Sequence, residues 1–419
     1  MHPIAWLCGR SRSLSKMDLS SEPTTAPLPK TCVVWDPALT AYNFGPGHPM
    51  DPARLALTAD LAEQLELFSR GSVHRAEPFV ASDAQLSTVH APSYIAAVRS
   101  VSETPRELPE WGLGTVDDPV FPGMHEASAR LVGGSLLAAE AIIDGSAQRG
   151  VNFAGGMHHA SRDRASGFCV YNDAAAAVQR LLDSGVRKVA YLDVDAHHGD
   201  GTQSIFYDDP RVLTVSLHES GLSLFPGTGF ANETGGPAAI GSAVNIALPA
   251  YTGDGGWLRA FHAVVPQVTR AFGPEVIVSQ HGCDSHREDP LTHLGTSVDA
   301  QREAALTIGM LADELCEGRW LATGGGGYSV ADVVPRVWSH LIAIVSGKPV
   351  PVRTEVPEQW RQRVRAEFGA EAPRLMGDDV ELWWRSWQVG YNPADAVDRS
   401  IMATRKEIFP LYGLDPWFD

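Results

Sequence analysis

Short runs of β-branched and apolar residues alternate along this chain with longer stretches rich in alanine and leucine. The runs have the length and composition of buried strands, and they lie at residues 32–35, 151–154, 189–194, 212–217, 276–280 and 320–324. The longer stretches have the length and composition of helices, and they include residues 126–143, 172–184, 257–272 and 297–316. Strands that alternate with helices favour an α/β fold, in which helices cover both faces of a mostly parallel sheet.

The chain has 419 residues, of which 44% are hydrophobic, so it can build one large core without a second domain. Residues 1–29 are rich in Ser, Thr and Pro and lack periodicity, which predicts a disordered tail. Residues 30–350 are predicted to form a single globular domain. Residues 351–419 contain helical stretches and several tryptophans, and we expect them to form a helical extension packed on that domain.

Charge and cysteine content restrict the classes of partner. The formal net charge is −17, and phosphate contacts need a basic surface, so we expect no nucleic-acid partner. An acidic surface suits cationic partners instead. The five cysteines are scattered and include no CxxC pair, which fits a reducing compartment. No apolar run is long enough to cross a membrane, and we expect a cytoplasmic protein without a membrane partner.

Four of the predicted strands are followed by loops that carry reactive side chains. The loops read GGMHHA (155–160), DVDAHHGDG (193–201), QHGCDSHREDP (280–290) and GGGGY (324–328). Open α/β sheets bind their ligands in a crevice at the carboxyl ends of the strands. The four loops are therefore predicted to meet at one site.

One group of these side chains has the pattern of a metal site. Asp195 and His197 are two residues apart, so in extended backbone their side chains point to the same side, and Asp284 can add a third ligand. Three protein ligands with an open position is the arrangement of catalytic Zn²⁺, although two carboxylates with one His leave Fe²⁺ and Mn²⁺ as alternatives. For an isolated Asp-x-His pair, a solvated turn is the better interpretation, but the three other loops weigh against it here.

The remaining loop residues fit proton transfer and oxyanion binding. His158 and His159 follow two glycines that allow both rings to face one pocket, and Asp193 and Asp200 are the candidates to orient them. Tyr328 follows four glycines, and a phenol beside a metal can donate a hydrogen bond to a developing oxyanion. The chain contains no phosphate-binding loop, GxSxG motif or second His at the zincin spacing.

Six motifs in order resemble the zinc-dependent histone deacetylase family. They are GGMHHA, ASGFCVYND (165–173), LDVDAHHGDG, VSLHES with LFPGTG (215–229), CDSHREDPL (283–291) and GGGGY. The resemblance spans residues 33–346 and implies a single-domain arginase-like α/β fold, with residues 30–350 as the catalytic domain. The stretches GPGHPMDPARL (45–55) and WGLGTVDDPVFPGMH (111–125) are similar to the bacterial class I-like branch, the acetoin utilisation deacetylases.

The resemblance implies a role for each matching position. The implied metal ligands are Asp195, His197 and Asp284. The implied catalytic residues are His158 paired with Asp193, His159 paired with Asp200, and the transition-state residue Tyr328. The implied residues of the acyl-lysine tunnel and its exit route are Phe168, Phe225, Leu291, Gly326, Met157 and Arg54, with Met157 near the tunnel mouth. A structural K⁺ is implied at Asp193, Asp195, His197, Ser216 and Leu217.

The activity that the resemblance implies is removal of acetyl groups from lysine side chains of a protein or peptide, with Zn²⁺ as cofactor. An acetylated acetyl-CoA synthetase in acetate or acetoin metabolism is the implied substrate. One alternative is an acetylpolyamine amidohydrolase, although the chain has no long insertion between residues 51 and 94 that would narrow the tunnel. A second alternative is an acyl-lysine binding module without turnover. A third is an arginase-like ureohydrolase, in which Tyr328 would have no role.

Overall fold

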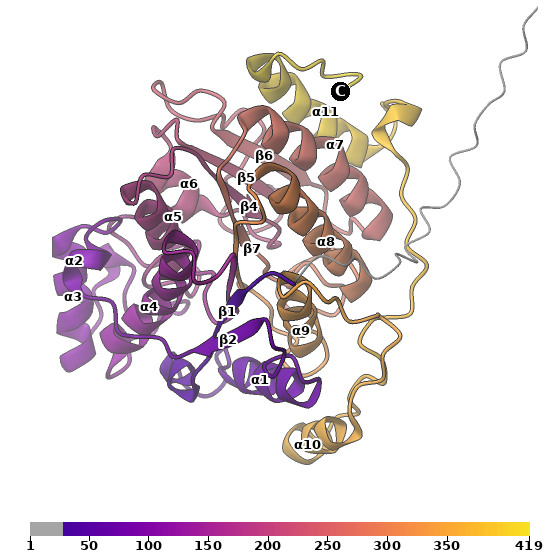
Figure 1. Ribbon diagram of the computed structural model, residues 1–419. Helices are drawn as coiled ribbons and strands as arrows, with labels where there is room; N and C mark the ends of the chain where they lie inside the picture. Colours follow the sequence, from indigo (N-terminus) through magenta and orange to yellow (C-terminus); the bar gives the residue numbers. More distant parts are fainter. Residues whose placement is uncertain (1–27) are drawn as a thin grey trace, which may run out of the picture.

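Residues 28–419 are described by a computed structural model, in which eight strands form one parallel sheet (Figure 1). The strands are β1 (Thr31–Val34), β2 (Val73–Ala76), β3 (Arg149–Asn152), β4 (Val189–Asp193), β5 (Val212–Glu219), β6 (Ala243–Leu248), β7 (Val276–Gln280) and β8 (Trp320–Thr323). Their order across the sheet is β2-β1-β3-β8-β7-β4-β5-β6. Disorder is predicted for residues 1–29, and residues 1–27 of that tail lie outside the described residues.

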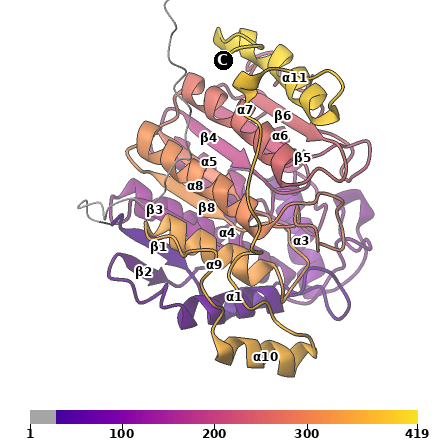
Figure 2. The same cartoon turned by 90° about the vertical axis from the view of Figure 1, so that its right-hand side faces the viewer.

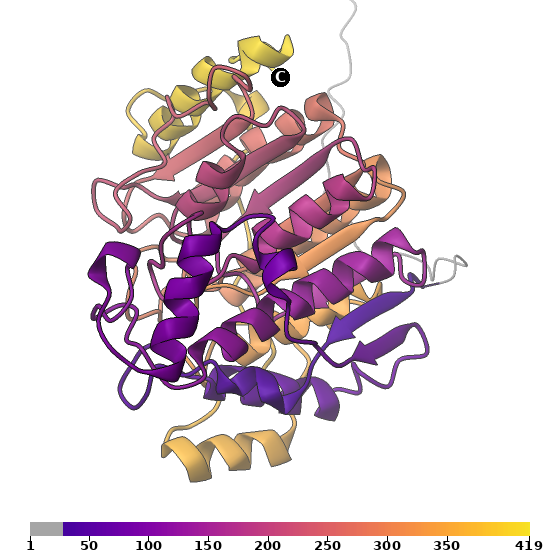
Figure 3. The same cartoon turned by 90° about the vertical axis from the view of Figure 1, so that its left-hand side faces the viewer.

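Helices cover both faces of the sheet, as the alternation of strands and helices predicts. One face carries α1 (Ala53–Gln64), α7 (Asp254–Phe272), α8 (Val298–Leu315) and α9 (Val334–Val345) (Figure 2). The opposite face carries α4 (Met124–Ile143) and α5 (Asp173–Asp183), with α6 (Asp200–Phe206) beside α5 (Figure 3). The other elements on that side are α2 (Asp83–Leu86), α3 (Pro92–Glu103), η1 (Pro37–Ala41) and η2 (Pro109–Trp111).

The central strands are buried on both faces, which explains their apolar sequences. Every residue of β1, β3, β4, β5, β7 and β8 is buried. Strands covered on both faces lose the alternation of polar and apolar residues and become continuously apolar. These six are the strands that the sequence predicts, each within two residues of its observed bounds.

Residues beyond the last strand pack against both ends of this body. Helix α10 (Glu358–Phe368) contacts α1, and the indole Nε1 of Trp360 donates a hydrogen bond to the carbonyl oxygen of Leu57 at 2.9 Å. Helix α11 (Ala396–Ile408) contacts α7 and β6 at the other end, followed by η4 (Phe409–Tyr412) and preceded by η3 (Trp387–Val389). The segment from residue 351 onwards therefore spans the sheet from one edge to the other.

The order of the strands identifies where a ligand would bind. The chain passes from β3 to β4, and the later strands β8 and β7 fill the two places between them. Such a reversal of strand order creates a crevice at the carboxyl ends of the strands. The four loops with reactive side chains follow β3, β4, β7 and β8, which are adjacent in the sheet. Within residues 28–419, no helix is both long and apolar enough to cross a membrane.

Candidate active site

Asp195, His197 and Asp284 form a compact cluster at the ends of β4 and β7. These strands pair in register, with Asp193 opposite Gln280, so the loops that follow them leave the sheet side by side. The Nδ1 atom of His197 lies 2.9 Å from Oδ2 of Asp284 and 3.2 Å from Oδ1 of Asp195. One ligand atom from each residue lies within 4.8 Å of the others, and all three residues are buried. The structure thus brings the three predicted ligands together.

The surrounding backbone shows that the cluster suits a divalent cation. The amide of Gly326 donates to Oδ2 of Asp195, and the amide of Ala196 donates to Oδ1 of Asp284, both at 2.8 Å. These bonds leave the other oxygen of each carboxylate facing His197. A Cβ atom at Gly326 would collide with the Asp284 carboxylate, so only glycine allows this approach. Two buried carboxylates need a compensating positive charge, which a divalent cation supplies together with the open coordination position.

Electrostatic interactions shift the pKa values of all three residues. Burial alone would lower the pKa of His197, but the charges of Asp284 and Asp195 outweigh it and hold that pKa well above its ordinary value. Burial would raise the pKa of Asp195, but the neighbouring histidines hold it well below its ordinary value. Burial and the charge of Asp195 raise the pKa of Asp284 to about 6. Such mutual shifts are characteristic of functional clusters.

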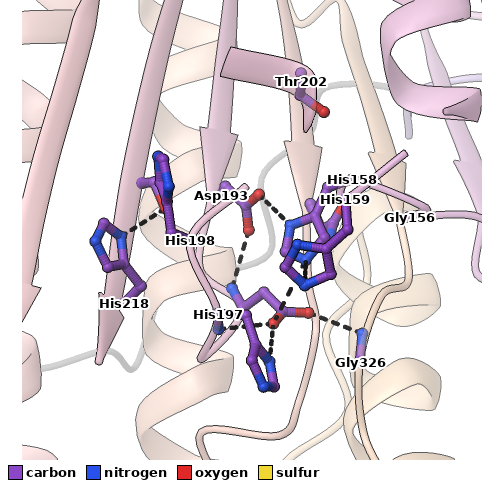
Figure 4. A network of polar contacts seen from close by, with 12 residues as sticks. Gly156, His158, His159, Asp193, His197, His198, Thr202, His218 and Gly326 are labelled. Atoms are coloured by element: carbon purple, nitrogen blue, oxygen red, sulfur yellow. Dashed lines mark hydrogen bonds and ion pairs between the residues drawn. The ribbon is translucent and has the colours of Figure 1, made fainter. Parts of the chain in front are cut away.

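The tandem histidines lie beside this cluster (Figure 4), and each is bonded to its own carboxylate. Nδ1 of His158 is 2.8 Å from Oδ2 of Asp193, and Nδ1 of His159 is 2.7 Å from Oδ1 of Asp200. The two Nε2 atoms face each other at 3.1 Å. Because each Nδ1–H donates to a carboxylate, the contact between the rings needs one Nε2–H donor and one Nε2 acceptor. The observed pairs match those that the resemblance implies.

The two imidazoles differ in charge. Burial alone would lower the pKa of His158, but the charges of Asp193 and Asp195 outweigh it and raise the pKa to about 9. Burial and the positive charge of His158 lower the pKa of His159 to about 4. His158 is accordingly the donor in the contact between the rings, and His159 is a neutral acceptor with its Nδ1–H held by Asp200.

Residues that the sequence analysis did not single out hold the histidine loop. The carboxylate of Asp173 accepts hydrogen bonds from the amides of Gly156 at 2.9 Å and Met157 at 2.8 Å. The side chain of Asn172 caps α5 and donates to the carbonyl oxygen of Ala160 at 3.0 Å. Both residues belong to the motif ASGFCVYND. The sequence feature that could have indicated their role is a pair of cap-forming polar residues at the start of a predicted helix.

His90 supports the same loop and makes the fold sensitive to acid. Its Nδ1–H donates to the carbonyl oxygen of Ser161, and its Nε2 accepts from the amide of Asn172, both at 2.9 Å. Burial lowers the pKa of His90 to about 4. A proton on Nε2 would also break the second of these bonds. Below about pH 6.5, the ordinary pKa of histidine, His90 takes up a proton in the unfolded chain. In the folded protein it does so only when the pH falls to about 4.

Lowering the pH from 7 to 5 is therefore expected to reduce the free energy of unfolding, with about 2 kcal/mol coming from His90 alone. In the His90→Gln variant, the side-chain amide can keep both hydrogen bonds but cannot titrate. Urea unfolding of chelator-treated protein at both pH values would measure the difference. An equal loss of stability in the wild type and in the variant would contradict this role of His90.

The glycine loop after β8 brings Tyr328 to the cluster. The Nη1 atom of Arg54 donates to the carbonyl oxygens of Gly325 at 2.9 Å and Gly327 at 3.3 Å, and its guanidinium lies over the ring of Trp338. Gly325 and Gly327 have φ angles of +150° and +142°, which L-residues rarely adopt. Burial and the charge of Asp284 raise the pKa of Tyr328 well above its ordinary value, so its phenol is a hydrogen-bond donor.

Two aromatic rings stand next to the catalytic side chains. The ring centroid of Phe225 lies 5.0 Å from that of His159, and the centroid of Phe168 lies 5.7 Å from that of Tyr328. Phe225 is 42% exposed, so this wall reaches the surface. Leu291 is half-buried, and its amide donates to Oδ1 of Asp289 at 3.0 Å. The roles of Phe168, Phe225 and Leu291 as walls and rim of a substrate tunnel stay predictions.

Met157 lies in a different place from the one that the resemblance implies. It is 1% exposed, and it lines a small internal cavity together with Arg54, Tyr42, Met50 and Leu131. Its amide is fixed by Asp173, inside the protein, so Met157 cannot shape the tunnel mouth. Arg54 is 3% exposed and lines the same cavity, and its place near an exit route stays a prediction.

Three of the residues implied for a potassium site lie on neighbouring strands of the sheet. Asp193 of β4 pairs with Ser216 of β5, which brings Leu217 close to the loop that begins after Asp193. The hydroxyl of Ser216 bonds to Nδ1 of His218 at 2.7 Å, and Nε2 of His218 bonds to the carbonyl oxygen of Gly229. His218 thereby has a structural role in this region.

The fold and the loops together define a class of protein. The histone deacetylase domain family matches residues 48–345, and the chain belongs to that family of metal-dependent deacetylases. Among curated proteins, the chain is 40% identical over 380 residues to the acetoin utilization protein AcuC of Bacillus subtilis, covering 89% of this chain and 97% of that protein.

A second relative supports the same branch of the family. The chain is 38% identical over 354 residues to the AcuC protein of Staphylococcus xylosus, covering 84% of this chain and 91% of that protein. A third, AcuC of Staphylococcus aureus strain MRSA252, is 39% identical over 336 residues. The chain therefore belongs to the AcuC-like bacterial branch, as the resemblance implied.

Proposed function

We propose that this chain hydrolyses the acetyl amide of acetylated lysine side chains in a protein or peptide, with Zn²⁺ as its cofactor. The observation that carries the proposal is the buried cluster of Asp195, His197 and Asp284 beside two carboxylate-bound histidines and one tyrosine. These are the groups that metal-assisted amide hydrolysis needs, namely a metal site, a base and an oxyanion donor.

The side chains divide the reaction among them. When bound by the three ligands, the cation would lower the pKa of water towards about 7 and polarise the acetyl carbonyl. His159, whose Nδ1–H is held by Asp200, takes the proton from the attacking water at Nε2, and its hydrogen bond with Nε2 of His158 breaks so that this lone pair becomes available. The contact between the Nε2 atoms lets His158 and His159 share protons, and either can protonate the leaving lysine nitrogen. The carbon–nitrogen bond then breaks to give acetate and a free amine.

The remaining residues bind and orient the substrate. Tyr328 donates its phenolic O–H to the oxygen that becomes negative as water adds to the acetyl carbon. Phe168 and Phe225 flank the aliphatic part of the lysine side chain. Gly326 leaves room for close approach of the substrate, and Leu291 lies at the rim. Arg54, whose Nη1 atom bonds to the glycine loop, is placed near the route by which acetate leaves.

The setting of the reaction is part of the same proposal. The relatives are named for acetoin utilisation, and we propose an acetylated enzyme of that metabolism, an acetyl-CoA synthetase, as the substrate in the cytoplasm. We also propose that a structural K⁺ binds near Asp193 and Ser216. The negative net charge of the chain favours substrates in which lysines or other cationic groups surround the acetylated one.

The decisive experiment compares two substrates under metal control. Chelator-stripped protein is assayed on a fluorogenic acetyl-lysine peptide and on acetylspermidine, before and after stoichiometric Zn²⁺, Fe²⁺ or Mn²⁺. Peptide deacetylation that returns with Zn²⁺ is the expected result. Turnover of acetylspermidine alone would replace the protein substrate by a polyamine. Peptide binding without turnover would indicate a binding module, and failure to bind any of the three metals would overturn the assignment of the site.

A further inference from the structure

Asp378 lies beyond the residues that match the family, yet it bonds to the elements that carry two catalytic loops. Its Oδ2 atom is 2.8 Å from Nε2 of His286, in the loop that follows β7. The same oxygen accepts a hydrogen bond from the amide of Val298 at the start of α8, at 2.9 Å. Its Oδ1 atom accepts from Nη1 of Arg336 in α9 at 2.8 Å. One carboxylate thus joins the β7 loop, α8 and α9.

The first of these bonds leads to the metal cluster. His286 is two residues from Asp284, and its amide donates to the carbonyl oxygen of Cys283 at 3.2 Å, which closes a tight turn around Asp284. The carbonyl oxygen of His286 accepts from the amide of Asp289 at 2.9 Å. The carboxylate of Asp289 in turn accepts from the amide of Tyr328 at 2.8 Å. His286 is therefore connected to a metal ligand and to the proposed oxyanion donor.

Arg336 makes a second connection to the tyrosine loop. It belongs to the first turn of α9, the helix that follows the glycine loop with Tyr328. Its Nη1 atom also donates to the carbonyl oxygen of Gly377 at 3.0 Å, and its Nε atom donates to that of Asp332 at 2.6 Å. The guanidinium is buried, so its partners in residues 377–378 replace water.

The segment around Asp378 is itself firmly held. The amide of Asp378 donates to Oδ2 of Asp299 at 2.6 Å, and the amide of Gly377 donates to the carbonyl oxygen of Val352 at 2.7 Å. Met376 is fully buried, and its carbonyl oxygen is 3.1 Å from Nε2 of His340. Burial would raise the pKa of Asp378, but the bond from His286 and the charge of Arg336 outweigh it and hold that pKa below its ordinary value.

We propose that Asp378 is a positioning residue for the hydrolysis, which fixes the β7 loop and the start of α9 so that Asp284 and Tyr328 keep their catalytic geometry. This inference rests on the proposed function. It extends the catalytic unit past residue 345, the end of the family match, into a segment that otherwise has the appearance of an accessory extension. Partners of metal ligands are known to contribute strongly to affinity and rate.

The same segment offers a matched control in Asp398. Its side chain is fully buried, compared with 7% exposure for that of Asp378, and it accepts hydrogen bonds from Nε of Arg259 in α7 at 2.5 Å and from Nη2 of Arg385 at 2.7 Å. Its pKa is also held below its ordinary value, by Arg259 against the effect of burial. Asp398 therefore matches Asp378 in chemistry and burial, but its bonds do not lead to any of the four loops.

The test compares Asp378→Asn with Asp398→Asn in the full-length protein. We expect both substitutions to lower Tm, because each breaks a buried ion pair. Only Asp378→Asn is expected to lower kcat and zinc affinity, each by about tenfold with little change in KM, the range seen for groups that orient metal ligands. Equal kcat and zinc affinity in both variants would overturn the inference and leave a purely structural role for Asp378.

A second pair of variants tests the bond to His286 without altering Asp378. His286→Ala removes the donor, whereas His286→Gln keeps an N–H that can reach the carboxylate. Lower kcat in the alanine variant with recovery in the glutamine variant would support positioning through this bond, and equal values would contradict it. Zinc affinity distinguishes the positioning role of Asp378 from the proposed deacetylase function. The wild type could show no deacetylation while Asp378→Asn still binds zinc more weakly than Asp398→Asn. In that case the positioning role of Asp378 at the metal site stands and the proposed function falls.

Discussion

Asp284→Asn should bind zinc more than about 100-fold less tightly than the wild type and lose deacetylation at ordinary zinc concentrations, since loss of an outer partner of a ligand already costs about 10–100-fold. The substitution keeps the shape of the side chain, and its oxygen can still accept from the amide of Ala196. It replaces the oxygen that faces His197 by an N–H₂ group, which cannot bind a cation. Metal content after dialysis and turnover of the acetyl-lysine peptide would measure both effects.

Thermal unfolding provides the control for this variant. Metal-free Asp284→Asn is expected to be at least as stable as the metal-free wild type, because it removes the repulsion between Asp284 and Asp195. Zinc at about 100 times its Kd should add about 2.7 kcal/mol to the free energy of unfolding of the wild type, and far less to that of the variant. An equal rise of Tm in both proteins would place the zinc elsewhere.

Tyr328→Phe is expected to lower kcat by roughly 10²–10³-fold, or about 3–4 kcal/mol of barrier, with little change in KM. The phenol is protonated, because burial and nearby carboxylates raise its pKa. Phenylalanine keeps the edge-on contact with Phe168, and the backbone bond to Asp289 is unaffected. The variant should therefore fold and retain the zinc-dependent rise of Tm, while it loses the donor to the oxyanion.

Tyr412→Phe is the matched control for the tyrosine experiment. Its phenol donates to the carbonyl oxygen of Gly241 at 2.9 Å, in the C-terminal region and away from the four loops. Its kcat should equal that of the wild type. Steady-state kinetics on the acetyl-lysine peptide would compare the two variants. A kcat for Tyr328→Phe within threefold of the control would remove Tyr328 from the mechanism.

The two strands that the sequence did not predict, β2 and β6, lie at the two edges of the sheet. Strand β2 reads VHRA and lies at the edge of the sheet, where two of its four residues are exposed. Strand β6 contains Asn245, whose side chain donates to Gln203 at 2.8 Å and to the carbonyl oxygen of Glu233 at 3.0 Å. Asn245 interrupts an otherwise apolar run, and its partners, 42 and 12 residues away in the chain, cannot be recognised from the strand alone.

The convergence of the four loops could be predicted because each motif directly follows an apolar run. The side chains that support the loops could not be predicted in this way. His286 and Asp378 are separated by 92 residues, and nothing local in either stretch indicates the other. Within residues 28–419, the carboxylate of Asp289 bonds only to backbone amides, at Tyr328 and Leu291, and a backbone partner leaves no trace in the sequence. Met157 was placed wrongly because adjacency to the tandem histidines does not determine which way its side chain points.

The insertion of β8 and β7 between β3 and β4 has a consequence for how the protein is made. While the chain leaves the ribosome, β3 and β4 are complete long before the two strands that separate them. Asp195 and Asp284 come together only after β7 has entered the sheet, and Tyr328 joins them only after β8. The centre of the sheet is thus closed by late, non-local pairings, which form slowly because distant segments must first meet. Metal binding during synthesis would therefore report the last stage of folding rather than an early one.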